Sequence, residues 1–112
     1  MSQITTHVLD TASGKPAVGV PIYLYQQNGS DWIELGCGIT NNDGRVKGLV
    51  DEGRLPSGIY RMHFDTKCYF SSHEIDGFYP YVDVVFELDD SGSHYHVPLL
   101  LSPFGYSTYR GS

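Results

Sequence analysis

Hydrophobic and polar residues alternate with a period of two along most of this chain, a pattern typical of β-strands that bury one face. Counting a short piece after Gly44, the pattern predicts about eight strands with turn signals between them. Strands at such regular spacing favour an all-β fold, a two-sheet antiparallel β-sandwich. The longer alternating segments cover residues 4–10, 20–25, 33–39, 59–64, 82–88, 94–101 and 105–110.

Two local signals interrupt the alternation. Residues 41–44, Asn-Asn-Asp-Gly, are a strong hairpin-turn signal because glycine tolerates a positive φ angle. Residues 67–75 fit one short helix, which the Asp-Gly pair at 76–77 would end. The side chains of this helix that can face the core are Tyr69, Phe70 and Ile75.

Length and composition indicate a single folded domain over residues 1–112. Hydrophobic residues make up 40% of the chain and aromatic residues 13%, enough to bury a core. The formal net charge is −6 and the seven basic residues are scattered, which disfavours nucleic acid as a partner. No apolar stretch approaches transmembrane length, and the first residues lack the regions of a signal peptide. The sequence therefore predicts a cytoplasmic protein without a membrane partner.

The two cysteines are predicted to be free thiols, with a disulfide between them as the less favoured alternative. Cys37 lies in phase with Ile33, Leu35 and Ile39, so we expect a small buried hydrophobe on one strand face. Cys68 lies outside any metal-ligand spacing.

The last segment, residues 94–112, carries the strongest hint of a site. A C-terminus normally frays, yet polar and apolar side chains alternate here up to the final residues. His94 and His96 are two apart, so on a strand they point to the same face. An apolar stripe on the other face would anchor the strand in the core, and it consists of Tyr95, Val97, Leu99 and Leu101.

Other candidates for chemistry are His7 on the first strand, Arg45 directly after the turn, and Ser112 at the end. Taken alone, His7 and Arg45 are more typical of solvated surface side chains. Together with His94 and His96 they fit two kinds of chemistry. One is a zinc site of three imidazoles with an open position, and the other is metal-free hydrolysis in which imidazoles move protons for water. Spacing does not separate the two.

Four segments of the chain resemble the 5-hydroxyisourate hydrolases, the transthyretin-related enzymes of urate breakdown. The resemblance runs from about residue 4 to residue 112, and the terminal Tyr-Arg-Gly-Ser is the signature of that family. The middle of the chain resembles transthyretin as well, which supports the fold without choosing a function. The four segments are Thr-His-Val-Leu-Asp-Thr at 6–11, Gly-Lys-Pro-Ala at 14–17, Asp-Gly-Arg at 43–45, and the tail at 94–112.

The resemblance implies a transthyretin-like sandwich that assembles as a homotetramer, a dimer of dimers, with active sites in the cleft between dimers. It implies 5-hydroxyisourate as the small-molecule substrate. Water would open the ring amide to give 2-oxo-4-hydroxy-4-carboxy-5-ureidoimidazoline. No cofactor and no metal ion is implied.

The family's catalytic residues match four positions of this chain, which are His7, Arg45, His96 and Ser112. Its substrate-binding residues match His7, Arg45, His96, Tyr109, Arg110 and Gly111. The histidines are able to exchange protons near neutral pH, and the planar Arg45 guanidinium suits an oxygen-rich ring or its oxyanion. Which histidine is the base, and what His94 does, are left open.

The competing hypothesis is a transthyretin-type binding protein that carries hormone-like ligands without catalysis. Fold and assembly do not distinguish the two functions. As the resemblance implies, hormone carriers lack the catalytic histidines and the Tyr-Arg-Gly-Ser tail. Because this chain has both, the sequence favours the hydrolase.

Overall fold

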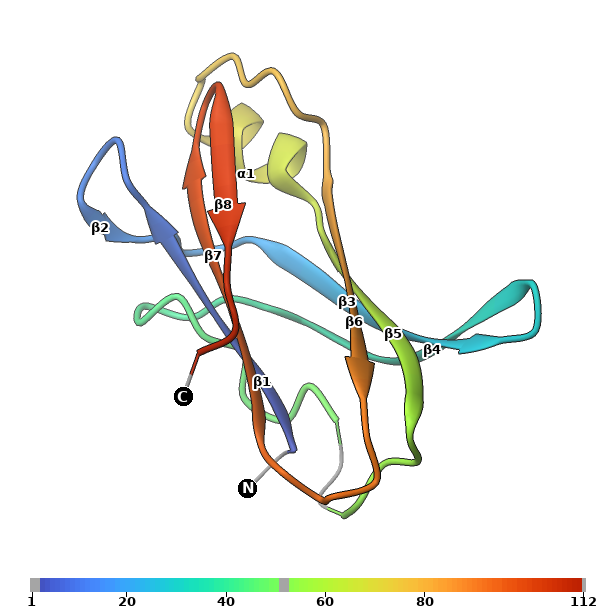
Figure 1. Ribbon diagram of the computed structural model, residues 1–112. Helices are drawn as coiled ribbons and strands as arrows, with labels where there is room; N and C mark the ends of the chain where they lie inside the picture. The colour runs from blue at the N-terminus through green and yellow to red at the C-terminus, as the bar shows by residue number, and fades with distance from the viewer. Residues whose placement is uncertain (1–2, 51–52, 112) are drawn as a thin grey trace.

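The computed structural model describes residues 3–50 and 53–111, and within them two four-stranded sheets face each other, with one short helix at one end (Figure 1). The first sheet contains, in spatial order, β2 (Lys15–Pro16), β1 (Ile4–Asp10), β7 (Tyr95–Ser102) and β8 (Gly105–Thr108). The second contains β4 (Asp31–Ile39), β3 (Pro21–Asn28), β5 (Gly58–Phe64) and β6 (Val82–Leu88), and the helix α1 spans Thr66–Ser72. The predicted two-sheet sandwich with one short helix is confirmed.

The core lies between the two sheets and is built by the alternation seen in the sequence. Buried and half-buried residues alternate along the whole of β1. The stripe predicted on the last segment, Tyr95 to Leu101, is buried as expected. Fully burying an aliphatic side chain of this kind stabilises a fold by roughly 1.5–3 kcal/mol. Residues of both sheets with no exposed surface include Val8, Ile22, Leu24, Met62 and Leu99.

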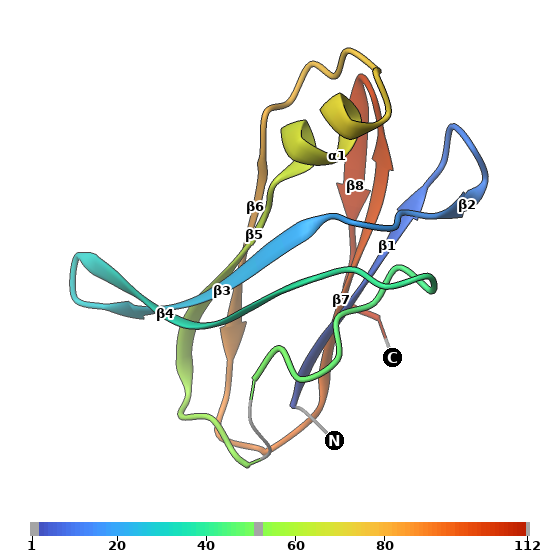
Figure 2. The same cartoon turned by 180° about the vertical axis from the view of Figure 1, so that it is seen from behind.

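The central pair of the first sheet departs from the antiparallel expectation. β1 and β7 run parallel, with Thr5 beside His96 and His7 beside Pro98. Figures 1 and 2 both show these strands lying side by side. A parallel pair requires a long crossover connection, and here the whole second sheet lies between the two strands in sequence. The pairing therefore places a strand from near the start of the chain beside one from near its end.

The helix is shorter than predicted. Asp65 caps its start by accepting a hydrogen bond from the Cys68 amide at 3.0 Å, and Tyr69 and Phe70 are buried as expected. The chain leaves the helix at Ser72, and Glu74 takes a left-handed conformation with φ of 56°. Ile75 follows this reversal and is 42% exposed, so its predicted inward orientation is wrong. No helix in residues 3–50 and 53–111 is long and apolar enough to cross a membrane.

The predicted burial of Cys37 is also wrong. Cys37 and Ile39 are exposed because the inner face of β4 is formed by the intervening glycines Gly36 and Gly38, which pair with the buried residues of β3. Segment 46–50 packs directly on those glycines, so a Cβ atom at either one would collide with it. Cys37 and Cys68 are both free thiols, which confirms the other half of the cysteine prediction.

The short strand predicted after Gly44 is absent from the described part of the chain. Arg45 instead makes a single bridge to His7. The eighth described strand is β2, a two-residue element that the alternation did not indicate.

Candidate active site

The outer face of β1 and β7 carries the imidazoles that the sequence singled out. Along both strands every second residue is buried in the core, which leaves His7 and His96 on the opposite face. Both histidines are half-buried. Because Thr5 lies beside His96 in the parallel register, His7 lies diagonally across from His96, one step along the sheet.

A tight turn delivers Arg45 to the same face. The Asn41 side chain accepts hydrogen bonds from the amides of Asp43 at 2.9 Å and Arg45 at 3.1 Å. The Gly44 carbonyl then accepts a hydrogen bond from the Val8 amide at 2.8 Å. The backbones of Arg45 and His7 form an isolated antiparallel β-bridge, which puts the two side chains on the same face. Gly44 has φ of 74°, and a Cβ atom there would collide with the Val8 carbonyl. Glycine is therefore required at the point where the turn docks against β1.

The Thr5 hydroxyl contacts both the His96 and the His94 rings. The Thr5 hydroxyl oxygen lies 2.8 Å from His96 Nδ1 and 3.0 Å from His94 Nε2. The His94 and His96 rings are nearly parallel, at 17°, with their centres 6.4 Å apart. The structure thus places the two histidines on one face, as their spacing predicted, and adds a hydroxyl that joins them.

The tail approaches His96 from the other side. The Gly111 amide donates to the His96 carbonyl at 2.8 Å, and a Cβ atom on Gly111 would lie 2.5 Å from His96 Cδ2. Tyr109 is exposed. Ser112, predicted to be catalytic, lies outside the described residues.

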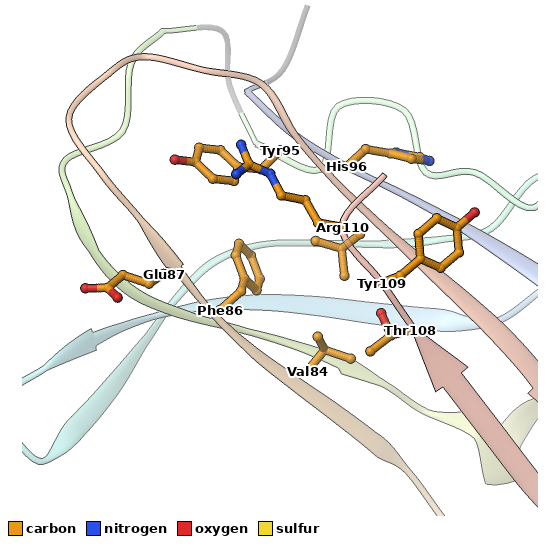
Figure 3. Close-up of a pocket in the computed structure, with 9 residues that line it drawn as sticks. Val84, Phe86, Glu87, Tyr95, His96, Thr108, Tyr109 and Arg110 are labelled. Carbon is orange, nitrogen blue, oxygen red and sulfur yellow. The ribbon is translucent and has the colours of Figure 1, made fainter. Parts of the chain in front are cut away.

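Arg110 does not join the histidines. Its guanidinium carbon lies 4.5 Å from the centre of the Tyr95 ring, and Tyr95 belongs to the inner face of β7. The two side chains line a cavity of about 260 Å³ between β6 and β8. Figure 3 shows them among the other residues that line it. His96 borders this cavity but His7 and Arg45 do not. The role of Arg110 in substrate binding stays a prediction.

The surroundings favour a neutral His96. Partial burial first, and then the charges of Arg45, His94 and His7, lower the pKa of His96 below the usual imidazole value of about 6.5. A neutral imidazole near pH 7 has a lone pair with which to accept a proton from water. Arg45, permanently cationic beside it, is suited to stabilise an oxyanion. These are the kinds of side chain that general-base hydrolysis requires.

The structure brings together three of the predicted site residues, His7, Arg45 and His96, and Gly111 packs against His96. The sequence motifs did not indicate Thr5 as a residue of this site. Its even spacing from His7 was visible in the sequence, but its contact with His96 depends on a parallel register that periodicity does not encode. Within residues 3–50 and 53–111, no three His, Cys, Asp or Glu side chains are grouped as metal ligands.

Comparisons with known proteins agree with the family resemblance of the sequence motifs at 6–11, 14–17, 43–45 and 94–112. The family model described as HIUase/Transthyretin family matches residues 4–111. The chain is 47% identical over 113 residues to a 5-hydroxyisourate hydrolase of Mus musculus, covering 99% of this chain and 96% of the mouse protein. The structure of Klebsiella pneumoniae 5-hydroxyisourate hydrolase matches with a TM-score of 0.85 and 32% identity, over 97% of this chain and 98% of that one. Transthyretin from Sparus aurata matches with a TM-score of 0.92 and 33% identity, over 99% and 97% of the two chains. The chain belongs to the HIUase/Transthyretin family, which confirms the resemblance indicated by its sequence motifs.

Proposed function

We propose that this protein is a hydrolase that opens the ring amide of 5-hydroxyisourate with water, giving 2-oxo-4-hydroxy-4-carboxy-5-ureidoimidazoline in urate degradation. The observation that carries the proposal is the gathering of His7, Arg45 and His96 on one outer sheet face. The hydrolase names of the mouse and Klebsiella relatives support the same substrate.

Each of the three side chains has a role in the proposed reaction. His96, whose pKa is lowered, takes a proton from water through Nε2, since Nδ1 is engaged by Thr5. The hydroxide attacks the ring carbonyl, and Arg45 stabilises the oxyanion that forms. His7 in its protonated form gives a proton to the leaving ring nitrogen. The proposal uses no cofactor or metal ion, and a contribution from Ser112 stays a prediction.

We also propose that the chain acts as a homotetramer, a dimer of dimers, in the cytoplasm. Support comes from β6 and β8, which are edge strands of the two sheets and lie across one cavity from each other. Unpaired edges with exposed apolar side chains are common contact surfaces between chains. Here the exposed side chains include Val85, Phe104 and Tyr106.

The second candidate, ligand carriage without catalysis, is favoured by one observation. The transthyretin structure superimposes on this chain with the higher TM-score, 0.92 against 0.85. A carrier, however, has no use for a neutral imidazole held beside an arginine. The site therefore supports the hydrolase better.

One assay tests the choice. 5-Hydroxyisourate is generated from urate by urate oxidase, and its decay is followed by absorbance with and without the purified protein. We expect decay to accelerate in proportion to protein concentration, and His96→Ala to lower the rate at least about a hundredfold. Decay at the uncatalysed rate, together with stoichiometric binding of an aromatic hormone-like ligand, would favour the carrier.

A further inference from the structure

The Thr5 hydroxyl lies within hydrogen-bonding distance of two imidazole nitrogens, His96 Nδ1 at 2.8 Å and His94 Nε2 at 3.0 Å. A threonine hydroxyl has one proton to donate. It can donate to only one of the two rings, so at least one of the rings must donate an N–H to the hydroxyl oxygen. The protonation patterns of His94 and His96 are therefore coupled through Thr5.

Resting on the proposed function, we propose that Thr5 and His94 are positioning residues that hold His96 as the Nδ1–H tautomer, with Nε2 unprotonated. In this arrangement His96 Nδ1–H donates to the Thr5 oxygen, and the Thr5 hydroxyl donates to His94 Nε2. Nε2 of His96, the nitrogen that Thr5 does not engage, then presents its lone pair to water.

The contacts of the His96 ring favour this tautomer. The ring is restrained from both sides, by Thr5 at Nδ1 and by Gly111 against Cδ2. A restrained ring keeps its proton on the nitrogen that has a fixed acceptor.

The same chain of contacts gives the proton from water a place to go. When Nε2 of His96 takes a proton from water, the Nδ1 proton passes to the Thr5 oxygen. The Thr5 proton passes at the same time to His94 Nε2, so Thr5 keeps one proton and His96 stays neutral. His94 becomes the imidazolium, and because it is exposed it can return the proton to solvent. Positive charge thereby moves away from the partly buried His96 ring, on which the charges of Arg45 and His7 also act.

The first test reads the tautomer directly and needs no substrate. Protein labelled with ¹⁵N-histidine is examined by long-range ¹H–¹⁵N NMR at about pH 8, where an ordinary imidazole is neutral. We expect His96 to show a protonated Nδ1 in the unmodified protein and in Thr5→Ser, and to shift toward Nε2–H in Thr5→Val. Thr11→Val is the matched control, because its hydroxyl donates to the Leu101 carbonyl at the far end of the same strand pair. A protonated Nε2 in the unmodified protein, or spectra unchanged by Thr5→Val, would overturn the proposal.

The second test is kinetic. Valine suits a strand, so Thr5→Val should fold, which circular dichroism checks. Its kcat on 5-hydroxyisourate should fall about ten- to a hundredfold, the range for groups that orient a functional imidazole, with KM little changed. Thr5→Ser should recover most of the loss, and Thr11→Val should behave as the unmodified protein.

A double variant separates positioning from bulk effects. If Thr5 and His94 act as one unit, Thr5→Val combined with His94→Phe should be no slower than the slower single variant. Additive losses would refute the relay. An unmodified protein without hydrolase activity but with the Nδ1–H tautomer would refute the proposed function and keep the positioning contact. Full activity in Thr5→Val would refute the contact's role and keep the function.

Discussion

The Gly111 backbone lies so close to His96 that a methyl group on its α-carbon would come 2.5 Å from the ring atom Cδ2. Gly111→Ala should therefore push the His96 ring off its contact with Thr5. We expect kcat to fall at least about tenfold while thermal stability changes little, because a shift of about 1 Å costs a reacting group much of its efficiency. Steady-state kinetics and a melting curve check this. Gly105→Ala is the control, because a Cβ atom there would meet only the Ser102 hydroxyl at 3.7 Å.

Alanine substitutions at Gly44 and Gly14 separate the cost of backbone strain from the cost of a steric collision. Gly44 and Gly14 have the same φ of 74°, but only a Cβ atom at Gly44 would collide, with the Val8 carbonyl. Gly14→Ala should lose about 1–2 kcal/mol from its left-handed backbone alone. Gly44→Ala should lose more, and should also lose activity as Arg45 moves away from His7. Denaturant unfolding and the hydrolase assay measure the two effects. Equal losses of both stability and activity in the two variants would contradict the docking role of Gly44.

Activity should persist at mildly acid pH. The pKa of His96 is lowered, chiefly by burial, so its neutral form survives below the usual imidazole value of about 6.5. We expect the acid limb of kcat/KM to lie below that pH. The same shift affects stability: the unfolded chain takes up a proton first, so the free energy of unfolding should fall as pH drops below about 6.5. In His96→Gln this contribution should vanish, and an acid limb above pH 6.5 in the unmodified protein would count against His96 as the base.

Arg110 should act by holding the tail. Its stacking on Tyr95 is worth about 0.5–1 kcal/mol at an exposed site, so Arg110→Ala should lower the melting temperature only slightly. Activity should fall further than stability, because the loosened tail no longer keeps Gly111 on His96. Arg110→Lys, which keeps the charge but stacks less well, should be intermediate. An activity loss confined to KM, with kcat unchanged, would instead favour direct contact with substrate.

A buried hydrogen bond joins the helix to the first sheet. Tyr69 donates to the Asp10 carboxylate at 2.7 Å, and both side chains are buried. Burial, and after it this bond and the Asp10 charge, raise the pKa of the Tyr69 hydroxyl. Tyr69→Phe should cost about 1–3 kcal/mol, since it leaves a buried acceptor short of a donor. Tyr81→Phe, at an exposed ring, is the control, and both are measured by urea unfolding with catalysis expected to be unaffected.

The sequence predicted the strands well because alternation reflects burial directly. From Val82 to Leu88 the predicted and observed bounds agree fully. The predicted burial of Cys37 was wrong because its apolar neighbours suggested an inner face, whereas the inner positions are glycines beneath a packed loop. The predicted inward orientation of Ile75 was wrong because Glu74, in a left-handed conformation, reverses the chain just before it.

The site was predictable only in part. His7, Arg45 and His96 were identified through the family's motifs, and the structure places them on one face. The contact of Thr5 with His96 was not predictable, because strand alternation gives the face of a side chain but not its partner across the sheet. The side of the sheet to which Arg110 turns was equally hidden, since it lies past the end of β8.

The hydrogen bond between Thr5 and His96 joins residues 91 positions apart. Closing so long a loop is entropically costly and slow, so contacts of this kind form late in folding. A ribosome making this chain releases the first strand early, but that strand has no parallel partner until the last fifth of the chain emerges. The second sheet can pair from consecutive or near-consecutive segments in the meantime. A chain that has emerged only as far as β6 can therefore form the second sheet, but the contact between Thr5 and His96 has to wait for β7.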